Sequence, residues 1–524
     1  MRKRFNVNGV CYPDEHYMVN IDSRLDKIKA LVDNGKYFVI NRARQYGKTT
    51  TLTMLARRLS QEYQVFFISF EGLGDAVYID ERAFCRRVCG LLYDTIYYGE
   101  TGSVTEKIQE TCCHMSQKDA EVDLRILSNF FSHICMESDR PVVLIIDEVD
   151  QASGQEIFLS FLGMLRDKYM RRRSRPTFRS VILAGVYDIK NLKVKIRKGE
   201  EPQYNSPWNI AEKFTVAMSF SQDDIGKMLE EYSDDLNLEM DTGYMAQMIY
   251  DYTGGYPFLV SRICQLVDES ESGHGASWTK EGILKAVKTI LEEKNTLFDD
   301  MGKKLTDVPG LDQMLRSILF DGKRISYSPD DYATELGMMF GYLKNEKGIV
   351  MVSNRIFETR LYNRYLSESV KKSAIADVAS MGKNQFVADG VLNMDLVMEK
   401  FMVHFTRIYG DSDTKFLEEN GRRIFLTYLQ PIINGTGNYY IEARTRDMRR
   451  TDVVVDYHGR QYVIELKIWH DNEYNHRGEL QLAGYLDDYG LSQGYLVSFN
   501  FNKNKRTGLK EIQRKGKRIL EVVV

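Results

Sequence analysis

Four short, uninterrupted apolar runs, separated by stretches with helical spacing, constrain the fold of the first part of this 524-residue chain. They are YFVI (37–40), VFFISF (65–70), VVLIID (142–147) and SVILAG (180–185). Each run is apolar at consecutive positions, which is typical of a strand that is covered on both faces. Because helices supply that cover between parallel strands, the sequence predicts an α/β fold with a parallel sheet over residues 1–220.

The first run leads directly into NRARQYGKTTTL, which opens a helix, and this is the context of a phosphate-binding loop. Backbone N–H groups would surround phosphate oxygens, Lys48 would neutralise phosphate charge, and the Thr49 hydroxyl would complete a Mg²⁺ shell. The motif usually has a glycine six residues before its lysine, where this chain has Arg42. The predicted ATP-binding residues of the loop are Arg44, Gln45, Tyr46, Gly47, Lys48, Thr49 and Thr50.

The third run ends in two acidic residues, Asp147 and Glu148. Open α/β sheets bind ligands at the carboxyl ends of their strands. Asp147 is therefore expected to hold Mg²⁺ through water, and Glu148 to polarise the water that attacks ATP. An acidic turn after a core strand would explain Asp147 alone, but it would make no use of the loop upstream. The two motifs together predict ATP binding and hydrolysis.

These segments resemble the AAA-like ATPases of bacteria, which are related to STAND and archaeal-type ATPases. The resemblance covers about residues 1–275 and rests on RQYGKTT, FISFEGLGD, VVLIIDEVDQAS, AGVYDIKNL, SPWNIAEKF and TGGYPFLVSRIC. It implies ATP and Mg²⁺ as cofactors, a first loop glycine that is often replaced, and a TGGYP segment that packs near the nucleotide. Asp188 in AGVYDIKNL is either a sensor of the γ-phosphate or a helix cap.

A second group of charged residues lies on two strands expected near the C-terminus. In YVIELKIW, Glu465 and Lys467 share one face, and both faces carry apolar residues, so the strand is expected to be covered on both sides. Ionised groups there are costly unless they are paired or bind a metal. The turn YHGRQ predicts a hairpin that brings Asp452 of RTDVVVDY beside Glu465. The two carboxylates predict a Mg²⁺ or Mn²⁺ site at which Lys467 orients water or stabilises charge on a phosphate.

Two flanking helices can complete this site. QLAGYL puts Gln481 and Tyr485 on one helix face, and FLEENGRRIFLTYL offers Glu418 or Glu419 as a further metal ligand. A solvated charge on a surface helix is the alternative for each glutamate.

This order of residues resembles the PD-(D/E)XK nuclease superfamily, and the subfamily commonly fused to AAA-like ATPases, over about residues 393–510. Thr451 stands where the superfamily's name has proline. The resemblance implies the metal ligands Glu419 (Glu418 second), Asp452 and Glu465, the catalytic lysine Lys467, and a downstream QxxxY element formed by Gln481 and Tyr485.

The sequence thus predicts an N-terminal P-loop ATPase followed by a C-terminal α/β nuclease-like domain. The expected parts are the ATPase core (1–220), a helical lid (221–292), a winged helix read as two helices and a hairpin (293–366), a polar linker (367–391) and the nuclease-like domain (392–524). An amphipathic helix with Met394, Val397, Met398, Phe401 and Phe405 on one face is expected to open the last part.

Composition narrows the partners. A net charge of −3 argues against a surface that is basic all round, so nucleic acid would be bound by local basic patches. One such patch is Lys503–Arg518, which would be either a DNA-facing tail or a solvated helix face. Arg171, Arg172, Arg173 and Arg175 form a similar run. No apolar run reaches the ~18 residues that span a bilayer. Seven scattered cysteines fit free thiols in a reducing cytoplasm.

The preferred hypothesis is an ATP-regulated nuclease acting on DNA. The main rival is a nucleotide-dependent switch whose nuclease fold is catalytically silent and only binds nucleic acid. RNA as the substrate, a homo-oligomer and a partner protein stay open.

Overall fold

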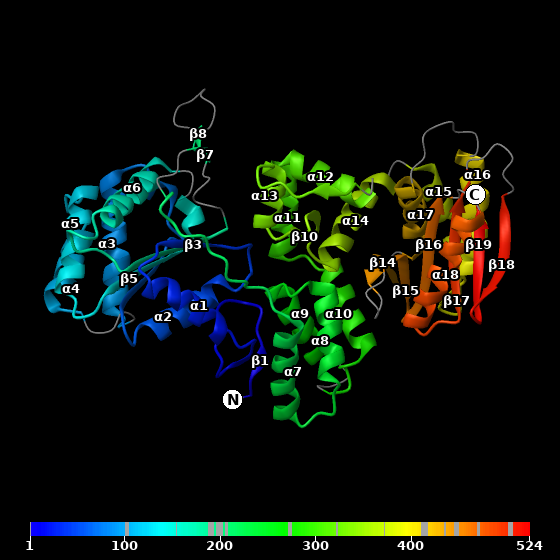
Figure 1. Cartoon of the computed structure of the whole chain (residues 1–524), viewed down its shortest axis with the longest axis horizontal. Coiled ribbons are helices and arrows are strands. Elements are labelled where there is room, and N and C mark those ends of the chain that lie inside the picture. Colours follow the sequence, from blue (N-terminus) through cyan, green and yellow to red (C-terminus); the bar gives the residue numbers. More distant parts are fainter. Residues whose placement is uncertain are drawn as a thin grey trace. The chain divides into compact units, whose positions relative to one another are not determined.

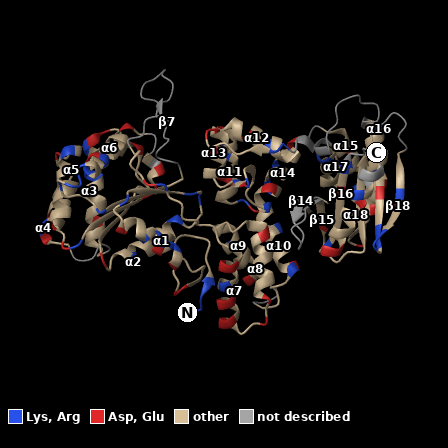
Figure 2. Cartoon of the chain, in the orientation of Figure 1, with Lys and Arg blue, Asp and Glu red and all other residues tan. Residues whose placement is uncertain are grey.

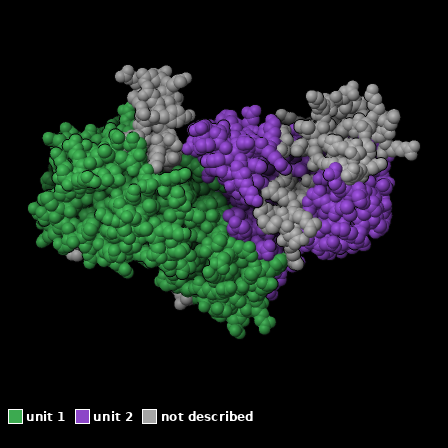
Figure 3. All heavy atoms as spheres, viewed as in Figure 1, with its two compact units in different colours: residues 1–246, 255–265, 339–341 green, residues 247–254, 266–338, 342–524 purple. Residues whose placement is uncertain are grey.

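The chain is described by a computed structural model. It covers residues 2–99, 104–152, 155–186, 193–194, 203–204, 208–270, 275–320, 323–370, 373–409, 418–433, 436–444, 450–468, 472–500 and 507–524. Two compact units are present, coloured separately in Figure 3. The first comprises residues 1–246, 255–265 and 339–341, and the second comprises residues 247–254, 266–338 and 342–524.

A four-stranded parallel sheet with the order β3-β6-β5-β4 forms the centre of the first unit (Figure 1). Its strands are β3 (Phe38–Asn41), β4 (Gln64–Ser69), β5 (Val142–Asp147) and β6 (Ser180–Gly185). They coincide with the four apolar runs, so the predicted parallel sheet is confirmed. Strands β5 and β6 are buried at every residue, because helices cover both faces of the sheet.

The helices of this α/β layer follow the strands in the order that the sequence predicts. They are α1 (Asp22–Asp33), α2 (Lys48–Leu59), α3 (Glu81–Tyr97), α4 (Glu106–Ser116), α5 (Leu124–Glu137) and α6 (Glu156–Met170). Cys85, Cys89 and Cys112 lie in their core, and all seven cysteines of the chain are free thiols, as expected.

Four helices follow the sheet, in the region expected to be helical. They are α7 (Gln222–Leu236), α8 (Thr242–Thr253), α9 (Pro257–Asp268) and α10 (Lys280–Glu292). Between α8 and α9 the chain turns at Gly254 and Gly255, which have φ values of 57° and 74°. The carbonyl of Gly255 accepts a hydrogen bond of 2.8 Å from the N–H of Phe220, and a Cβ at Gly255 would lie 1.9 Å from the Phe220 oxygen. Only glycine fits this position, both for its backbone angle and for its space.

In the second unit, two helices and a hairpin follow α11 (Thr296–Asp307), as the sequence predicts. The elements are α12 (Pro309–Phe320), β9 (Ile325–Ser326), α13 (Tyr332–Met339), β10 (Leu343–Glu346), β11 (Ile349–Val352) and α14 (Arg355–Val370). Strands β9, β10 and β11 form one antiparallel sheet.

The C-terminal sheet has six strands in the order β14-β15-β16-β17-β19-β18. Strands β14 (Gly437–Arg444), β15 (Arg450–Tyr457) and β16 (Arg460–Ile468) run antiparallel, while β17 (Gln493–Phe499) lies parallel to β16. The crossover between them is α18 (Asn472–Asp488), as a parallel pair requires. The opposite face carries α16 (Met394–Tyr409) and α17 (Glu418–Ile433), whose Phe401 and Gly421 contact Phe499. The five apolar positions predicted on α16 are all buried.

Residues 367–391, which the sequence analysis interprets as a linker, are folded over their described part. They contain α15 (Ala374–Met381) and the short hairpin β12 (Val387–Ala388) and β13 (Val391–Leu392). Ile375, Ala376 and Phe386 are buried, and α15 packs on α17. The interpretation as a linker is therefore corrected, because these small apolar residues recur at helical spacing and form a packed face.

From Gly508 on, the basic C-terminal segment lies in a hairpin of β18 (Gly508–Arg514) and β19 (Lys517–Val523), not in a helix (Figure 2). Its residues 503–506 lie outside the described part of the chain. Arg514 pairs with Glu479 at 2.7 Å, and Arg518 pairs with Asp395 and Glu511, each at 3.0 Å. These pairs reduce the positive potential expected there. In the arginine-rich run, Arg171 is paired with Asp167 and Arg172 lies over the Tyr169 ring.

Among the described helices, none is both long and apolar enough to cross a membrane.

Replacing Gly255 with alanine should destabilise the first unit by about 3 kcal/mol, because a Cβ combines an unfavourable left-handed backbone with a clash against Phe220. The control is Gly72→Ala, where φ is 73° but nothing lies within 4 Å, so about 1 kcal/mol of backbone strain is expected alone. Calorimetric unfolding of both variants measures the difference, and equal losses would contradict the predicted clash.

Candidate functional site

The phosphate loop connects β3 to the first residue of α2. Gly47 and Gln45 adopt left-handed backbone angles, with φ of 75° and 54°, which turn the chain sharply into the helix. Lys48 is 6% exposed, and its Nζ donates to the carbonyls of Arg42 and Ala43 at 3.1 and 3.0 Å. Burial lowers the pKa of Lys48, and the nearby carboxylates of the β5 end oppose this effect. The ammonium group is thus held over the loop, where phosphate would bind.

At the adjacent strand end, the Thr49 hydroxyl donates to Asp147 at 2.9 Å. Asp147 is 1% exposed, and its other oxygen accepts from the N–H of Glu148 at 2.8 Å. Burial raises the pKa of both Asp147 and Glu148. A hydroxyl and two carboxylates converging beside a phosphate loop are the oxygen ligands that Mg²⁺ prefers, so these residues fit a nucleotide with its ion.

Asp150 is a site residue that the sequence analysis missed. Its Oδ2 accepts a hydrogen bond of 2.6 Å from the N–H of Val186, and a Cβ at Gly185 would lie 2.7 Å from its Oδ1. The turn after β5 is therefore tied to the end of β6. The last aspartate of DEVD was the available signal, but its partners at the end of β6 become visible only once the strand order is known.

The side chain of Arg42 lies outside the phosphate loop, although Arg42 occupies the position that is usually glycine in this motif. Its Nη2 donates to the Val216 carbonyl at 2.9 Å and its guanidinium lies over the Phe214 ring, 5.1 Å from the centroid. The side chain points away from the phosphate position, which explains why the loop tolerates it.

The TGGYP segment contacts the phosphate loop directly through Tyr256. Its hydroxyl donates to the Arg44 carbonyl at 2.5 Å, and its ring packs edge-on against Tyr46 with centroids 4.8 Å apart. A Cβ at Gly341 would lie 3.1 Å from the Cβ of Ala43. The conformation of the loop therefore depends on a residue more than 200 positions away, in the TGGYP segment that the resemblance expects near the nucleotide. The hydroxyl of Thr50, a predicted ATP-binding residue, instead accepts from the Cys11 N–H at 3.2 Å.

In the second unit, Glu465 and Lys467 lie together on β16. Glu465 is 1% exposed and its Oε1 is 2.9 Å from the Lys467 Nζ. Val453 of β15 pairs with Ile464 of β16, the residue before Glu465. That Asp452 lies beside Glu465 stays a prediction. The side chains of Asp452, Glu418 and Glu419 lie outside the described part of the chain, as does Asp188. Over the described side chains alone, no group of three or more acidic, His or Cys residues is placed to hold a metal.

Helix α18 covers the face of β16 that carries this pair, since a Cβ at Gly478 would lie 3.6 Å from the Lys467 Cγ. On this helix Gln481 donates to the hydroxyl of Tyr485, which is 2% exposed. The two predicted residues thus contact each other and belong to the helix that covers the Glu465–Lys467 pair.

The same face carries a pair that the sequence analysis missed. The Ser498 hydroxyl donates to Glu521 at 2.9 Å, and both residues are buried. Leu496 of β17 pairs with Glu465 of β16 on one side and with Glu521 of β19 on the other, so the three residues form one row across the sheet. This row depends on the β16-β17-β19 order, which spacing along the chain does not show.

The parallel sheet, the phosphate loop and the acidic end of β5 define an AAA-like P-loop ATPase. The AAA-like domain family matches residues 12–368, so the chain belongs to this family. No curated protein matches the chain.

The chain is similar to several solved structures. The Walker-type ATPase paby2304 of Pyrococcus abyssi is similar with a TM-score of 0.50 and 13% identity, over 68% of this chain and 99% of that one. The ORC2 protein of Aeropyrum pernix, in its ADPNP–ADP complexes, matches at a TM-score of 0.40 and 11% identity, over 70% and 98%. The RuvB branch migration motor of Thermotoga maritima matches at 0.30 and 12%, over 64% and 92%.

Tyr256→Phe should weaken ATP binding about fivefold, because the Arg44 carbonyl loses a hydrogen bond worth about 1 kcal/mol while the ring contact with Tyr46 remains. Tyr63→Phe is the matched control, since it removes a hydroxyl bonded to Asp33 at 2.7 Å, away from the loop. Titration of ATP into each protein measures the affinity. Unchanged affinity in Tyr256→Phe would show that this contact does not position the loop.

Proposed function

We propose that this protein is an ATP-regulated, metal-dependent nuclease that acts on DNA. The observation that carries the nuclease part is the pair of Glu465, which is fully buried, and Lys467, with their charged atoms 2.9 Å apart on β16. An ionised carboxylate inside a sheet covered by helices on both faces is costly, so a catalytic or binding role is the best reason for it. The arrangement agrees with the resemblance to the PD-(D/E)XK superfamily.

The residues present can divide the chemistry between them. Asp452 and Glu465, with Glu419 from α17, would hold a divalent cation, which supplies charge stabilisation at a scissile phosphate. Lys467 is held at the carboxylate and would orient the attacking water or stabilise the charge that develops on the phosphate. Gln481 and Tyr485 would position the backbone of the nucleic acid from α18.

At the nucleotide site, Lys48 would bind the β- and γ-phosphates of ATP and Thr49 with Asp147 would hold Mg²⁺. Glu148 would orient the hydrolytic water. Burial raises the pKa of Glu148, which makes its carboxylate a stronger proton acceptor than that of an exposed glutamate.

ATP could regulate the nuclease-like domain through direct contacts that α10 and α14 make with it, instead of through the linker that the sequence predicted. Lys288 of α10 donates to the Thr436 carbonyl at 2.8 Å, and Lys280 donates to Gln461 at 2.8 Å. Within β14, the Tyr439 hydroxyl donates to Asn363 of α14 at 3.1 Å. We infer that α10 and α14, the latter next to the proposed winged-helix hairpin, report the nucleotide state to the β14–β16 strands.

Lys48→Ala should lower ATP affinity at least a hundredfold, because the loop loses the ammonium group that is held against the Arg42 and Ala43 carbonyls. Glu148→Gln should keep the affinity and abolish hydrolysis. Lys118→Ala, at an exposed helix-end position, serves as the control. Calorimetry and phosphate release measure the two steps, and wild-type affinity in Lys48→Ala would refute the assignment.

Glu465→Gln should eliminate metal-dependent cleavage while ATP hydrolysis continues, because it removes a ligand of the C-terminal site only. Glu511→Gln changes an exposed carboxylate in the same sheet and should cleave as the wild type does. The assay offers linear and circular DNA, single strands and RNA with Mg²⁺ or Mn²⁺, with and without ATP. Binding without cleavage by the wild type would favour the rival hypothesis of a silent fold, and cleavage of RNA alone would overturn the choice of DNA.

A further inference from the structure

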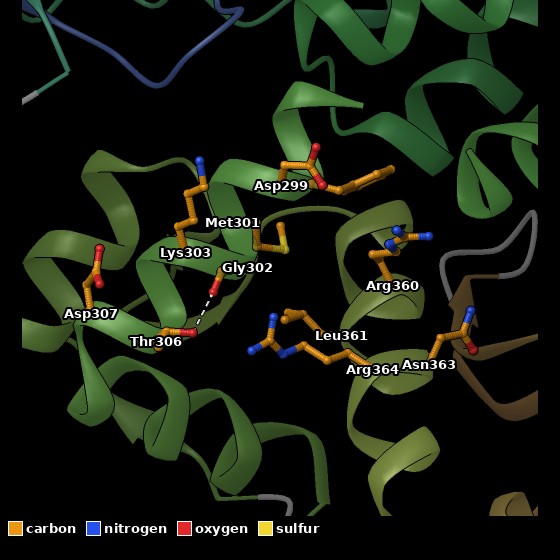
Figure 4. A pocket seen from close by; sticks show the side chains of 11 residues that line it. Asp299, Met301, Gly302, Lys303, Thr306, Asp307, Arg360, Leu361, Asn363 and Arg364 are labelled. Carbon is orange, nitrogen blue, oxygen red and sulfur yellow. Dashed lines mark hydrogen bonds between the residues drawn. The ribbon is translucent and has the colours of Figure 1, made fainter. Parts of the chain in front are cut away.

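A pocket of about 770 Å³ lies within the second unit, between α11 and α14 (Figure 4). Its volume lies within the range of small-ligand sites. Met301 and Leu361 give it an apolar floor, while Arg360, Arg364 and Lys303 bring positive charge. It shares no residue with either of the sites described above.

Arg364 is the central feature of this pocket. Its side chain extends from α14 toward α11, and its Nη1 lies 3.1 Å from the position that a Cβ at Gly302 would take. A glycine inside a helix costs about 1 kcal/mol relative to alanine. At this position the missing side chain leaves room for the guanidinium. Within the described ranges, the buried Nε of Arg364 has no hydrogen-bond partner. Such a donor gains strongly from an anionic acceptor.

One helical turn earlier, Arg360 is fixed in place. Its Nη1 donates to the Leu291 carbonyl, and its guanidinium lies over the Phe298 ring, 4.7 Å from the centroid. Because a guanidinium has about five N–H donors, these contacts set its orientation without using all of its donors. Two arginines one turn apart on α14 therefore line the same pocket.

The pocket also has two acidic residues, Asp299 and Asp307. A simple anion would use the arginines and leave these carboxylates without a role. A ligand that carries both a phosphate and hydroxyl or amino donors would satisfy both kinds of group. We propose that this pocket binds a mononucleotide, with its phosphate on Arg364 and Arg360 and its sugar or base donors toward Asp299.

The test uses the full chain with its phosphate loop saturated by ADP and Mg²⁺, so that added ligand reports on a second site. AMP and inorganic phosphate are then titrated by calorimetry. Wild type should bind one further equivalent of AMP, and Arg364→Gln should weaken that binding at least tenfold, because it removes the charge-assisted bonds to the phosphate. Arg324→Gln, at an exposed arginine of the same unit, should bind AMP as the wild type does.

A second variant guards against a folding defect in Arg364→Gln. Gly302→Leu places a bulky side chain in the pocket and improves helix propensity, so it should abolish AMP binding while ADP affinity at the phosphate loop stays unchanged. No further AMP binding by the wild type, or equal AMP affinity in Arg364→Gln, would overturn the proposal. Binding of phosphate without AMP would also overturn it, because the ligand would then not be a nucleotide. None of these outcomes depends on nuclease activity.

Discussion

Complete burial of β5 and β6 is the constraint on which the first unit depends. Strands buried at every residue can place polar groups only at their ends, because an unpaired polar group inside the sheet would lose its hydrogen bonds to water. Asp147 stands at such an end, where Thr49 and the Glu148 N–H supply its hydrogen bonds. The parallel direction of the strands brings this end beside the phosphate loop, so the packing of the sheet also sets the geometry of the nucleotide site.

Burial creates the second site in a different way. Glu465 lies within a strand rather than at its end, and it is stabilised by Lys467 on the same face. A buried ion pair is weak evidence for stability, because removing two charges from water costs about as much as their attraction returns. An apolar pair at these positions would serve the sheet equally well. The retention of two charges under α18 is therefore better explained by chemistry than by folding.

If the state of the nucleotide site affects the proposed nuclease site, the effect would have to pass through packed helices. Tyr256 joins the phosphate loop to the start of α9, and the tight turn at Gly255 fixes that start against Phe220. In the second unit, Lys280 of α10 bonds to Gln461 of β16, and Lys288 bonds to Thr436, the residue before β14. Short hydrogen bonds between rigid elements transmit displacement better than a flexible linker would, provided that the elements have two discrete arrangements.

The sequence by itself determined the features that repeat along the chain or lie close together in it. Continuous apolar runs gave the four parallel strands, and the alternation in YVIELKIW placed Glu465 and Lys467 on one face, since both depend only on local periodicity. Tertiary structure alone showed the hydrogen-bond partners of Asp150, Tyr256 and Glu521, because those partners lie far away in the chain. It also decided that residues 374–392 pack against α17 instead of linking two domains. The apolar residues of this segment are few and lie among polar ones in the sequence, yet a complementary surface is enough to bury Ile375, Ala376 and Phe386.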